Sequence, residues 1–220
     1  MMASMFNRKD NSMQIVPQSA TLKWITPNAM QEIESAGRVC YKSEAKITTE
    51  SAESFIRGII YRGHESVLEH ASASFHLVCD RGISHELVRH RIASFSQEST
   101  RYCDYGKAGE ISVIVPPQLG EAYESLGYNA WAAAVRQAES SYEQMRAQGL
   151  APQIARSVLP TCLKTEIRMT ANFREWRLIL SQRLSPKAHP QMRELMRLVA
   201  DVLVCECPIC FEDVIAQTRL

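Results

Sequence analysis

The chain has 220 residues, of which 25 are basic and 24 acidic, and a formal net charge of +1 at pH 7. This length suits one domain with a substantial core, and the balanced charge provides no bulk field that would attract nucleic acid. No apolar run approaches the roughly 20 residues that a membrane-spanning helix requires. We therefore expect neither nucleic acid nor a membrane as a partner.

The start of the chain is polar up to Met13 and contains no apolar core of a signal peptide. We predict a flexible tail over residues 1–13 and a single domain over residues 14–220. The seven cysteines lack the regular spacing of a disulfide framework. This favours a reducing compartment, and hence a cytoplasmic location.

A strand and two helices are the first elements that the sequence predicts. Loose alternation over residues 14–25 indicates the strand, and Asn28 is expected to begin a short helix. Thr48 or Thr49 is expected to cap the second helix, which runs to about Tyr61.

A second strand and a third helix follow. Small or polar residues alternate with apolar ones over residues 71–79, which predicts a half-buried strand. Gly82 is expected to turn the chain, and residues 83–89 to form a short packed helix.

Residues 89–102 join a cationic cluster to a polar segment. Arg89, His90 and Arg91 place two permanent cations and a titratable ring side by side, and Arg101 follows ten residues later. Clustered guanidinium groups with hydroxyl and amide side chains between them suit phosphates. A solvated charged face is the alternative, but the apolar pair before the cations favours a fixed site for an anion.

The second half of the chain is expected to contain further strands and helices. Alternation predicts strands over residues 112–115 and 162–170. Helices are predicted over residues 122–146, 151–158 and 172–182, where capping residues, Pro and Gly mark the helix ends. Asn172 is expected to cap the third of these, and Ser185 with Pro186 to begin a long last helix over residues 187–214.

Cys205, Cys207 and Cys210 form a Cys-x-Cys-x-x-Cys pattern. Such a pattern can hold zinc or an iron–sulfur cluster, but no second cysteine pair accompanies it. We expect free, buried cysteines near a helix end and no metal. A structural protein stabilised by zinc at these cysteines is the alternative.

The segment around the cationic cluster resembles the signature of the flavin-dependent thymidylate synthases. That family carries Arg-His-Arg, seven residues and Ser, commonly extended to Ser-x-Arg-Tyr. Residues 89–91 and Ser99 have this spacing here, and Arg101 and Tyr102 match the extension. Residues 63–70 match the family's Gly-His-Glu-[Ser/Thr]-x-x-Glu-His segment, and their histidines lack the helical spacing of a zinc protease.

The resemblance implies one FAD per chain and assigns residues to it. The residues expected to contact FAD are His64, Ser66, Arg89, His90, Arg91, Gln97, Asn172, Phe173, Arg174 and Leu178. At Leu178 relatives often have His or Asn, so a polar flavin contact is lost or replaced in this chain. The chain has no Gly-x-Gly-x-x-Gly after a strand and no P-loop, which excludes a Rossmann site.

The resemblance also assigns residues to the nucleotide dUMP. The residues expected to bind dUMP are Glu86, Leu87, Val88, Arg89, Gln97, Glu98, Ser99, Thr100, Arg101, Arg156 and Arg183. Arg183 falls where the family has an arginine on the uracil ring, so we assign it the catalytic role. Its permanent charge and planar guanidinium suit negative charge that develops toward O4 and N3 of the ring.

The implied enzyme is a methyltransferase that converts dUMP to dTMP, with NADPH and 5,10-methylenetetrahydrofolate as co-substrates. The implied fold is α/β, of the α+β type, with a mixed or antiparallel sheet flanked by helices and a long C-terminal helix. The implied assembly is a homotetramer with active sites at subunit interfaces. The alternatives are a relative that acts on dCMP or transfers a hydroxymethyl group and, from another class, a module that binds single-stranded nucleic acid.

Overall fold

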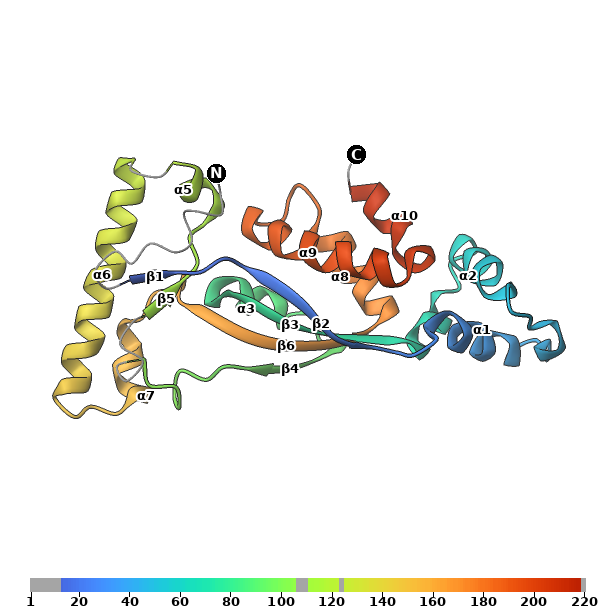
Figure 1. Ribbon diagram of the computed structural model, residues 1–220, viewed down its shortest axis with the longest axis horizontal. Helices are drawn as coiled ribbons and strands as arrows, with labels where there is room; N and C mark the ends of the chain where they lie inside the picture. Colours follow the sequence, from blue (N-terminus) through green and yellow to red (C-terminus); the bar gives the residue numbers. More distant parts are fainter. Residues whose placement is uncertain (1–12, 106–110, 123–124, 219–220) are drawn as a thin grey trace. The chain divides into compact units, whose positions relative to one another are not determined.

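The computed structural model describes residues 13–105, 111–122 and 125–218, which form a mixed α/β protein (Figure 1). The expected mixture of helices and strands is confirmed, although the strands form two sheets rather than one. The chain divides into two compact units, each described below by itself. Unit 1 comprises residues 1–19, 78–87 and 96–167, and unit 2 comprises residues 20–77, 88–95 and 168–220. The predicted tail lies outside the described residues except for Met13, which belongs to a strand.

The smaller sheet pairs β1 (Met13–Ile15) with β5 (Ile111–Val113) in parallel, with Met13 opposite Ile111. The larger sheet has the strand order β2 (Ser19–Ile25), β3 (Ser72–Asp80), β6 (Lys164–Asn172) and β4 (Ala93–Gln97). The single strand expected over residues 14–25 is therefore wrong, because it is divided between the two sheets. Pro17 lies in the break, where it lacks the amide hydrogen that a strand ladder needs.

Strand β6 carries the alternation that was read from the sequence. Thr165, Ile167 and Met169 are fully buried, and the residues between them are partly exposed. This pattern matches an inner strand with one face packed on a core. Strand β4 lies at the end of the strand order, as suits its polar composition.

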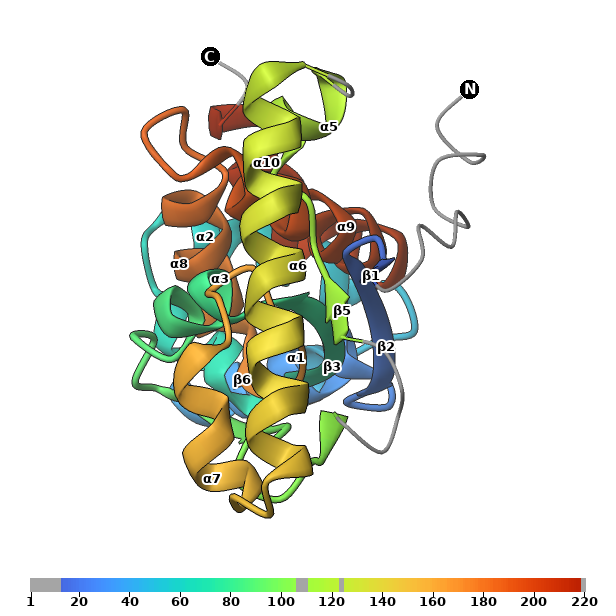
Figure 2. The same cartoon turned by 90° about the vertical axis from the view of Figure 1, so that its left-hand side faces the viewer.

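Unit 1 is built on the long helix α6 (Leu126–Ala147), beside which α7 (Pro152–Ala155) and the short helix η4 (Arg156–Val158) lie (Figure 2). Its buried side chains pack with strand β5 and include Tyr128, Val135 and Tyr142. The expected start of this helix at residue 122 is wrong. Ser125 caps α6 by accepting a hydrogen bond from the amide of Tyr128, and a separate short helix, α5 (Pro117–Glu121), precedes it. Helix α3 (Arg81–Leu87) also belongs to this unit.

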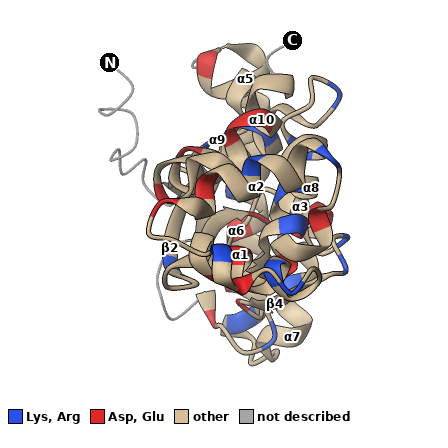
Figure 3. Ribbon diagram, turned by 90° about the vertical axis from the view of Figure 1, so that its right-hand side faces the viewer, with Lys and Arg blue, Asp and Glu red and all other residues tan. Residues whose placement is uncertain are grey.

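Unit 2 contains most of the helices among the described residues. They are α1 (Ala29–Val39), η2 (Glu44–Lys46), α2 (Ser51–Tyr61), η3 (Glu65–His70), α8 (Phe173–Arg183), α9 (Pro190–Glu206) and α10 (Pro208–Thr218). Helices α8, α9 and α10 pack together as one group, and α1 packs against α2 (Figure 1). Acidic and basic residues are interspersed along α1, α2 and α8 (Figure 3).

Two helix boundaries in unit 2 differ from expectation. Helix α2 has Glu50 at its N-cap position rather than a threonine, although Thr48 and Ser51 hydrogen-bond to each other beside it. The prediction of one long last helix over residues 187–214 is wrong, because this segment forms two helices that meet at Cys207. Pro208 has no amide hydrogen with which to continue α9 and instead occupies the first position of α10.

Among the described helices, none is both long enough and apolar enough to cross a membrane.

Candidate functional site

Helix α8 begins at a capped end that faces a cleft of unit 2. Asn172 accepts a 2.8 Å hydrogen bond from the amide of Glu175, which confirms the predicted cap. Asn172 and Glu175 have the spacing of a capping box, which fixes the first turn of the helix. Arg174 stands in this turn, and its Nη1 lies 2.6 Å from Oε1 of Glu69 on η3.

The cleft has a volume of about 520 Å³, within the range of small-molecule sites. Asn172, Arg174 and Leu178 are part of its lining, together with Glu69 and Ile92. Ile92 is 69% exposed and Leu178 45% exposed, so the cleft offers apolar side chains to solvent beside a cation. The structure thus brings together three of the residues that the sequence assigned to FAD.

The other residues assigned to FAD have different surroundings. His64 and Ser66 are exposed at the start of η3, and Arg89 and Arg91 are exposed between α3 and β4. Phe173 is fully buried, with its ring centroid 5.0 Å from that of Phe211. Its side chain therefore packs in the core of unit 2.

The other end of α8 carries Arg183, which is held by a buried histidine. Nε of Arg183 donates a 3.0 Å hydrogen bond to Nε2 of His90. Nδ1 of His90 lies 3.6 Å from Oε1 of Glu175, and both side chains are buried. Burial, and then the neighbouring charge of Arg183, lower the pKa of His90 to about 4. Burial raises the pKa of Glu175 above its ordinary value.

Another arginine of α8, the buried Arg177, binds this helix to its neighbours. It donates hydrogen bonds to Glu65 of η3, to the carbonyl of Cys210, and to both carboxylate oxygens of Asp213 on α10. A guanidinium group with its donors satisfied in this way is rigid. Arg177 therefore fixes two walls of the cleft relative to α8.

In unit 1, the end of β4 is held by a network of polar side chains. Nε2 of Gln97 donates to Ser84 Oγ at 2.8 Å and to Thr165 Oγ1 at 3.2 Å. Nη1 of Arg81 donates to the same threonine and to the carbonyl of Glu98. Gln97, assigned to both FAD and dUMP from the sequence, thus has its amide group engaged within the protein.

The carboxylate of Glu98 is also engaged. It accepts hydrogen bonds from the hydroxyl of Tyr105 at 2.7 Å, from Nζ of Lys164 at 3.3 Å and from the amide of Glu166 at 3.2 Å. Burial and the bond to Glu98 raise the pKa of Tyr105 well above its ordinary value. Glu98 therefore stabilises the conformation of the segment that follows β4.

That segment presents cations and hydroxyl groups. Nη1 of Arg156 donates a 3.0 Å hydrogen bond to Oγ1 of the buried Thr100. The hydroxyl of Ser99 accepts from the amide of Arg101, whose exposed guanidinium lies 5.4 Å from the ring centroid of Tyr102. Two exposed guanidinium groups beside hydroxyl donors suit an anion such as a phosphate.

The remaining residues assigned to dUMP adjoin helix α3. Leu87 is fully buried at its end, Glu86 is half-buried, and Val88 is 39% exposed. The side chain of Leu87 is therefore shielded from solvent.

All seven cysteines are free thiols. Cys207 and Cys210 are buried at the junction of α9 and α10, as expected, while Cys205 is exposed. Within the described residues, no group of three or more His, Cys, Asp or Glu side chains is arranged to hold a metal ion.

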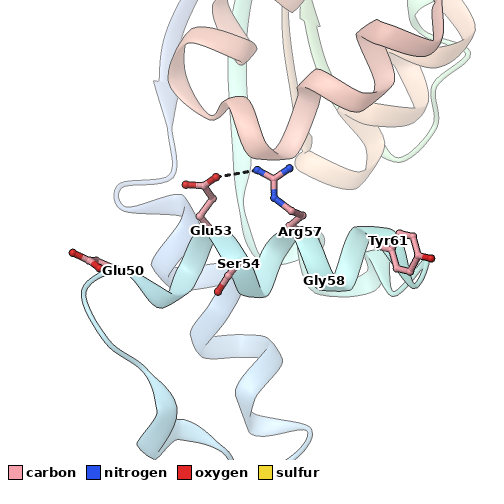
Figure 4. A pocket seen from close by; sticks show the side chains of 6 residues that line it. All are labelled: Glu50, Glu53, Ser54, Arg57, Gly58 and Tyr61. Atoms are coloured by element: carbon pink, nitrogen blue, oxygen red, sulfur yellow. Dashed lines mark hydrogen bonds and ion pairs between the residues drawn. The ribbon is translucent and has the colours of Figure 1, made fainter.

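A second hollow lies along α2 and is lined by Glu50, Glu53, Ser54, Arg57, Gly58 and Tyr61 (Figure 4). All of these residues come from one helix and the residue before it. Its opposite charges pair with each other, since Arg57 Nη2 lies 3.0 Å from Glu53 Oε1. This is an open helix surface without convergent groups, and it has no feature of a binding site.

Sequence reasoning missed several residues that shape these sites. Glu69 pairs with Arg174 across 105 residues of sequence, and such a pairing leaves no local signal. The Asn-x-x-Glu pattern marks the start of a helix, but it gives no signal that the Glu175 carboxylate lies beside His90. Lys164 is one member of a strand alternation and carries no motif of its own.

The chain matches the family described as thymidylate synthase complementing protein over residues 21–209. It is similar to the flavin-dependent thymidylate synthase of Mycobacterium sp. (strain JLS), with 36% identity over 203 residues that cover 82% of this chain and 78% of the relative. The similar enzyme of Mycobacterium bovis (strain BCG / Pasteur 1173P2) is 34% identical over 199 residues, with the same coverage.

Among solved structures, the chain has the fold of a UMP/dUMP methylase, PolB from Streptomyces cacaoi, bound with 5-Br dUMP. The TM-score is 0.78 at 22% identity, over 94% of this chain and 99% of that one. The matched family and the mycobacterial relatives agree with the signature at residues 89–102. The chain belongs to the flavin-dependent thymidylate synthase family.

Proposed function

We propose that this protein is a flavin-dependent thymidylate synthase that methylates dUMP to dTMP. Its cofactor is FAD, its reductant is NADPH, and 5,10-methylenetetrahydrofolate is the carbon donor. The observation that carries the proposal is helix α8 of unit 2. Its first turn presents Arg174 to a cleft with exposed apolar side chains, and its last turn holds Arg183 in one orientation.

The residues of the cleft fit a flavin nucleotide. Ile92 and Leu178 offer apolar surface to a planar ring system, and Arg174 offers positive charge to a diphosphate. We propose that Asn172 and Arg174 hold FAD there, with His64, Ser66, Arg89, His90, Arg91, Gln97 and the backbone of Phe173 as its further contacts. When bound, FAD supplies the hydride of the reaction. With FAD bound, Glu69 and the phosphates would both contact Arg174.

For the nucleotide, we propose that Arg101 and Arg156 neutralise the phosphate of dUMP. Ser99 and Thr100 supply hydroxyl groups beside them, and Gln97 and Glu98 keep this segment in place. Glu86, Leu87, Val88 and Arg89 complete the proposed nucleotide set. Since the phosphate keeps its charge throughout the reaction, these contacts bind substrate and transition state alike.

Arg183 has a different task. Reduction of the uracil ring moves negative charge toward O4 and N3, and a guanidinium group placed there stabilises that charge as it develops. Lysine would serve less well, because a point charge lacks the planar pair of donors. We propose Arg183 as the catalytic residue of this chain.

We also propose a homotetramer with active sites shared between subunits, a single domain over residues 14–220, and a cytoplasmic location. The tetramer rests on the family resemblance alone. Sedimentation of the purified protein tests it, and a fully active monomer would refute it.

The function is tested by incubating purified protein with FAD, NADPH, 5,10-methylenetetrahydrofolate and one nucleotide at a time. The nucleotides are dUMP, UMP and dCMP, and mass spectrometry identifies each product. We expect bound flavin absorbance and conversion of dUMP to dTMP. Protein that takes up no FAD, or that methylates no nucleotide, overturns the proposal. A hydroxymethylated product, or a product from dCMP alone, would identify a variant of the reaction instead.

A further inference from the structure

The contact between Arg183 and His90 reveals the protonation state of the histidine. A guanidinium group stays protonated in proteins, and each of its nitrogens is a donor only. Nε of Arg183 donates to Nε2 of His90 at 3.0 Å, so that ring nitrogen presents a lone pair. The imidazole is therefore neutral, and its single hydrogen sits on Nδ1.

The opposite side of the same ring faces a carboxylate. Oε1 of Glu175 lies 3.6 Å from Nδ1 of His90, slightly beyond hydrogen-bond distance. An ionised carboxylate can only accept a hydrogen, so its charge favours the tautomer with the hydrogen on Nδ1. At 5% and 6% exposure, Glu175 and His90 are shielded from water, which strengthens this influence.

Glu175 is itself well placed to act on the ring. Its amide is bonded to the Asn172 side chain, so its position follows from the cap of α8. Glu175 and Arg183 stand near opposite ends of α8, with the His90 ring between them.

The positive charges near His90 favour a neutral ring, while the negative charge of Glu175 favours a protonated one. Glu175 and Arg183 face it from α8, while Arg89 and Arg91 flank it on its own segment and are exposed. Burial lowers the pKa of His90 to about 4, and the charge of Arg183 acts in the same direction. The ring is therefore a hydrogen-bond acceptor for Arg183 at neutral pH.

We propose that His90 and Glu175 are positioning residues for Arg183: Glu175 sets the tautomer of His90, and His90 holds the guanidinium through its Nε2 lone pair. The catalytic consequence rests on the role proposed for Arg183 above. The positions of Glu175, His90 and Arg183 do not depend on that role, because they follow from the contacts described above. In this arrangement Nε2 of His90 is bonded to Arg183, so His90 affects turnover through the guanidinium group.

Two substitutions of His90 separate this role from a general structural one. The side-chain oxygen of glutamine in His90→Gln can replace the acceptor, whereas His90→Leu fills the space without any acceptor. We expect His90→Leu to lower turnover at saturating dUMP by about tenfold or more, the equivalent in rate of one lost hydrogen bond. His90→Gln should recover most of the loss. Equal loss in both variants contradicts the proposal.

Glu175→Gln removes the charge and keeps the shape. Because an amide can also donate, it permits the other tautomer, which turns a donor toward Arg183. We expect about a tenfold loss of turnover with an unchanged KM for dUMP and unchanged FAD affinity. Glu53→Gln is the matched control, since it removes a carboxylate of the same unit that pairs with Arg57 on exposed α2. The control should behave as the unchanged protein.

A measurement without catalysis tests the arrangement directly. ¹⁵N NMR of histidine-labelled protein, with His90 assigned by comparison with His90→Gln, should show a neutral ring protonated on Nδ1 at neutral pH. Its titration midpoint should lie at about 4. A midpoint near the ordinary value of about 6.5, or protonation on Nε2, overturns the proposal.

A failure of the catalytic role proposed for Arg183 can be distinguished from a failure of the positioning proposal. If Arg183→Ala keeps normal turnover, the catalytic role of Arg183 fails, while the NMR result still decides the pairing with His90. If Arg183→Ala is impaired but His90→Leu and Glu175→Gln are not, the positioning proposal is overturned and the proposed function stands. Thermal unfolding of each variant shows whether a loss of turnover reflects a loss of fold.

Discussion

Nη1 of Arg156 donates a 3.0 Å hydrogen bond to the hydroxyl of Thr100, a buried group 56 residues earlier in the chain. The bond aims an exposed guanidinium at the segment that follows β4, where Arg101 provides a second cation. Because a phosphate keeps its charge during the reaction, both arginines should act on nucleotide binding.

Arg156→Ala should raise the KM for dUMP by about ten- to a hundredfold and leave turnover at saturation almost unchanged. It removes a charge-assisted contact that is made equally in the substrate complex and in the transition state. Thr100→Val, which only loosens the guanidinium, should raise KM by about fivefold. Steady-state kinetics measure both effects, with Ser54→Ala on exposed α2 as the control. A fall in turnover larger than the rise in KM would show that Arg156 acts in the transition state.

The pair of Arg174 and Glu69 gives a prediction about the cofactor. Both side chains are about half exposed, so the pair contributes little to stability, but FAD must compete with Glu69 for the cation. Arg174→Ala should weaken FAD binding, and Glu69→Gln should leave it equal or a few-fold tighter. Fluorescence titration with FAD measures both affinities. Markedly weaker binding by Glu69→Gln would mean that the carboxylate aims Arg174 rather than competing for it.

The pairing of Arg177 with Asp213 predicts that the free energy of unfolding depends on pH. Burial alone would raise the pKa of Asp213, but the hydrogen bonds and charge of Arg177 outweigh burial and hold that pKa below its ordinary value. A carboxylate whose pKa is lowered by folding stabilises the fold above its unfolded pKa, about 3.9. That contribution is lost as the pH falls through the lower folded value.

Asp213→Asn should therefore flatten the dependence of unfolding free energy on pH in the acid range, with little change in the slope near neutral pH. Arg177→Met, which leaves partly exposed carboxylates and the buried carbonyl of Cys210 without their donor, should lower the unfolding free energy by about 1–3 kcal/mol. Denaturant unfolding at several pH values measures both. An unchanged acid dependence in Asp213→Asn would show that the pair is not formed in solution.

The sequence predicted those features that depend on local patterns. The alternation over β6 and the Asn172 cap of α8 each depend on neighbouring residues, and both were confirmed. The signature at residues 89–102 identified the family, because its letters and spacing are specific. Within residues 14–25, Pro17 was a local signal for a break in the strand. The assignment of the two halves to different sheets was not predictable, since it depends on which strand pairs with which.

The site itself was predicted as a set of residues but not as a set of contacts. His90 was read as a titratable ring between two arginines. It is a buried neutral ring, and its partners Glu175 and Arg183 lie about 90 residues later in the sequence. Glu98 was read as a ligand for the nucleotide, and its carboxylate is engaged by Tyr105 and Lys164. Long-range pairing of this kind depends on the fold and leaves no trace in local spacing.

The thiols should differ strongly in reactivity. Cys40 and Cys205 are exposed, whereas burial, followed by the charge of Asp80, raises the pKa of Cys79 to about 12. Because the thiolate is the reactive form, Cys79 should resist modification in the folded protein. A disulfide reagent should react rapidly with two thiols, and the double variant Cys40→Ser/Cys205→Ser should lose that fast phase. Rapid reaction at Cys79 would show that its strand opens.

The mechanism is most exposed to test at Arg183. The uracil ring gains negative charge only as it is reduced, so a guanidinium group facing it should strengthen its contact in the transition state. Arg183→Ala should lower turnover at saturating dUMP by about a hundredfold or more, the order seen when one charge-stabilising donor is lost. Reduction of the bound flavin by NADPH, followed without nucleotide, should change far less, because that half-reaction does not involve uracil.

Arg183→Lys sharpens the same test. Lysine keeps the charge but cannot donate from Nε to His90 while presenting a planar fork, so it should recover only part of the turnover. Stopped-flow measurement of each half-reaction separates flavin reduction from methylation in both variants. Near-normal turnover of Arg183→Ala at saturating nucleotide would make Arg183 a binding residue only. Full recovery by lysine would show that charge alone, without the orientation set by His90, is what the reaction needs.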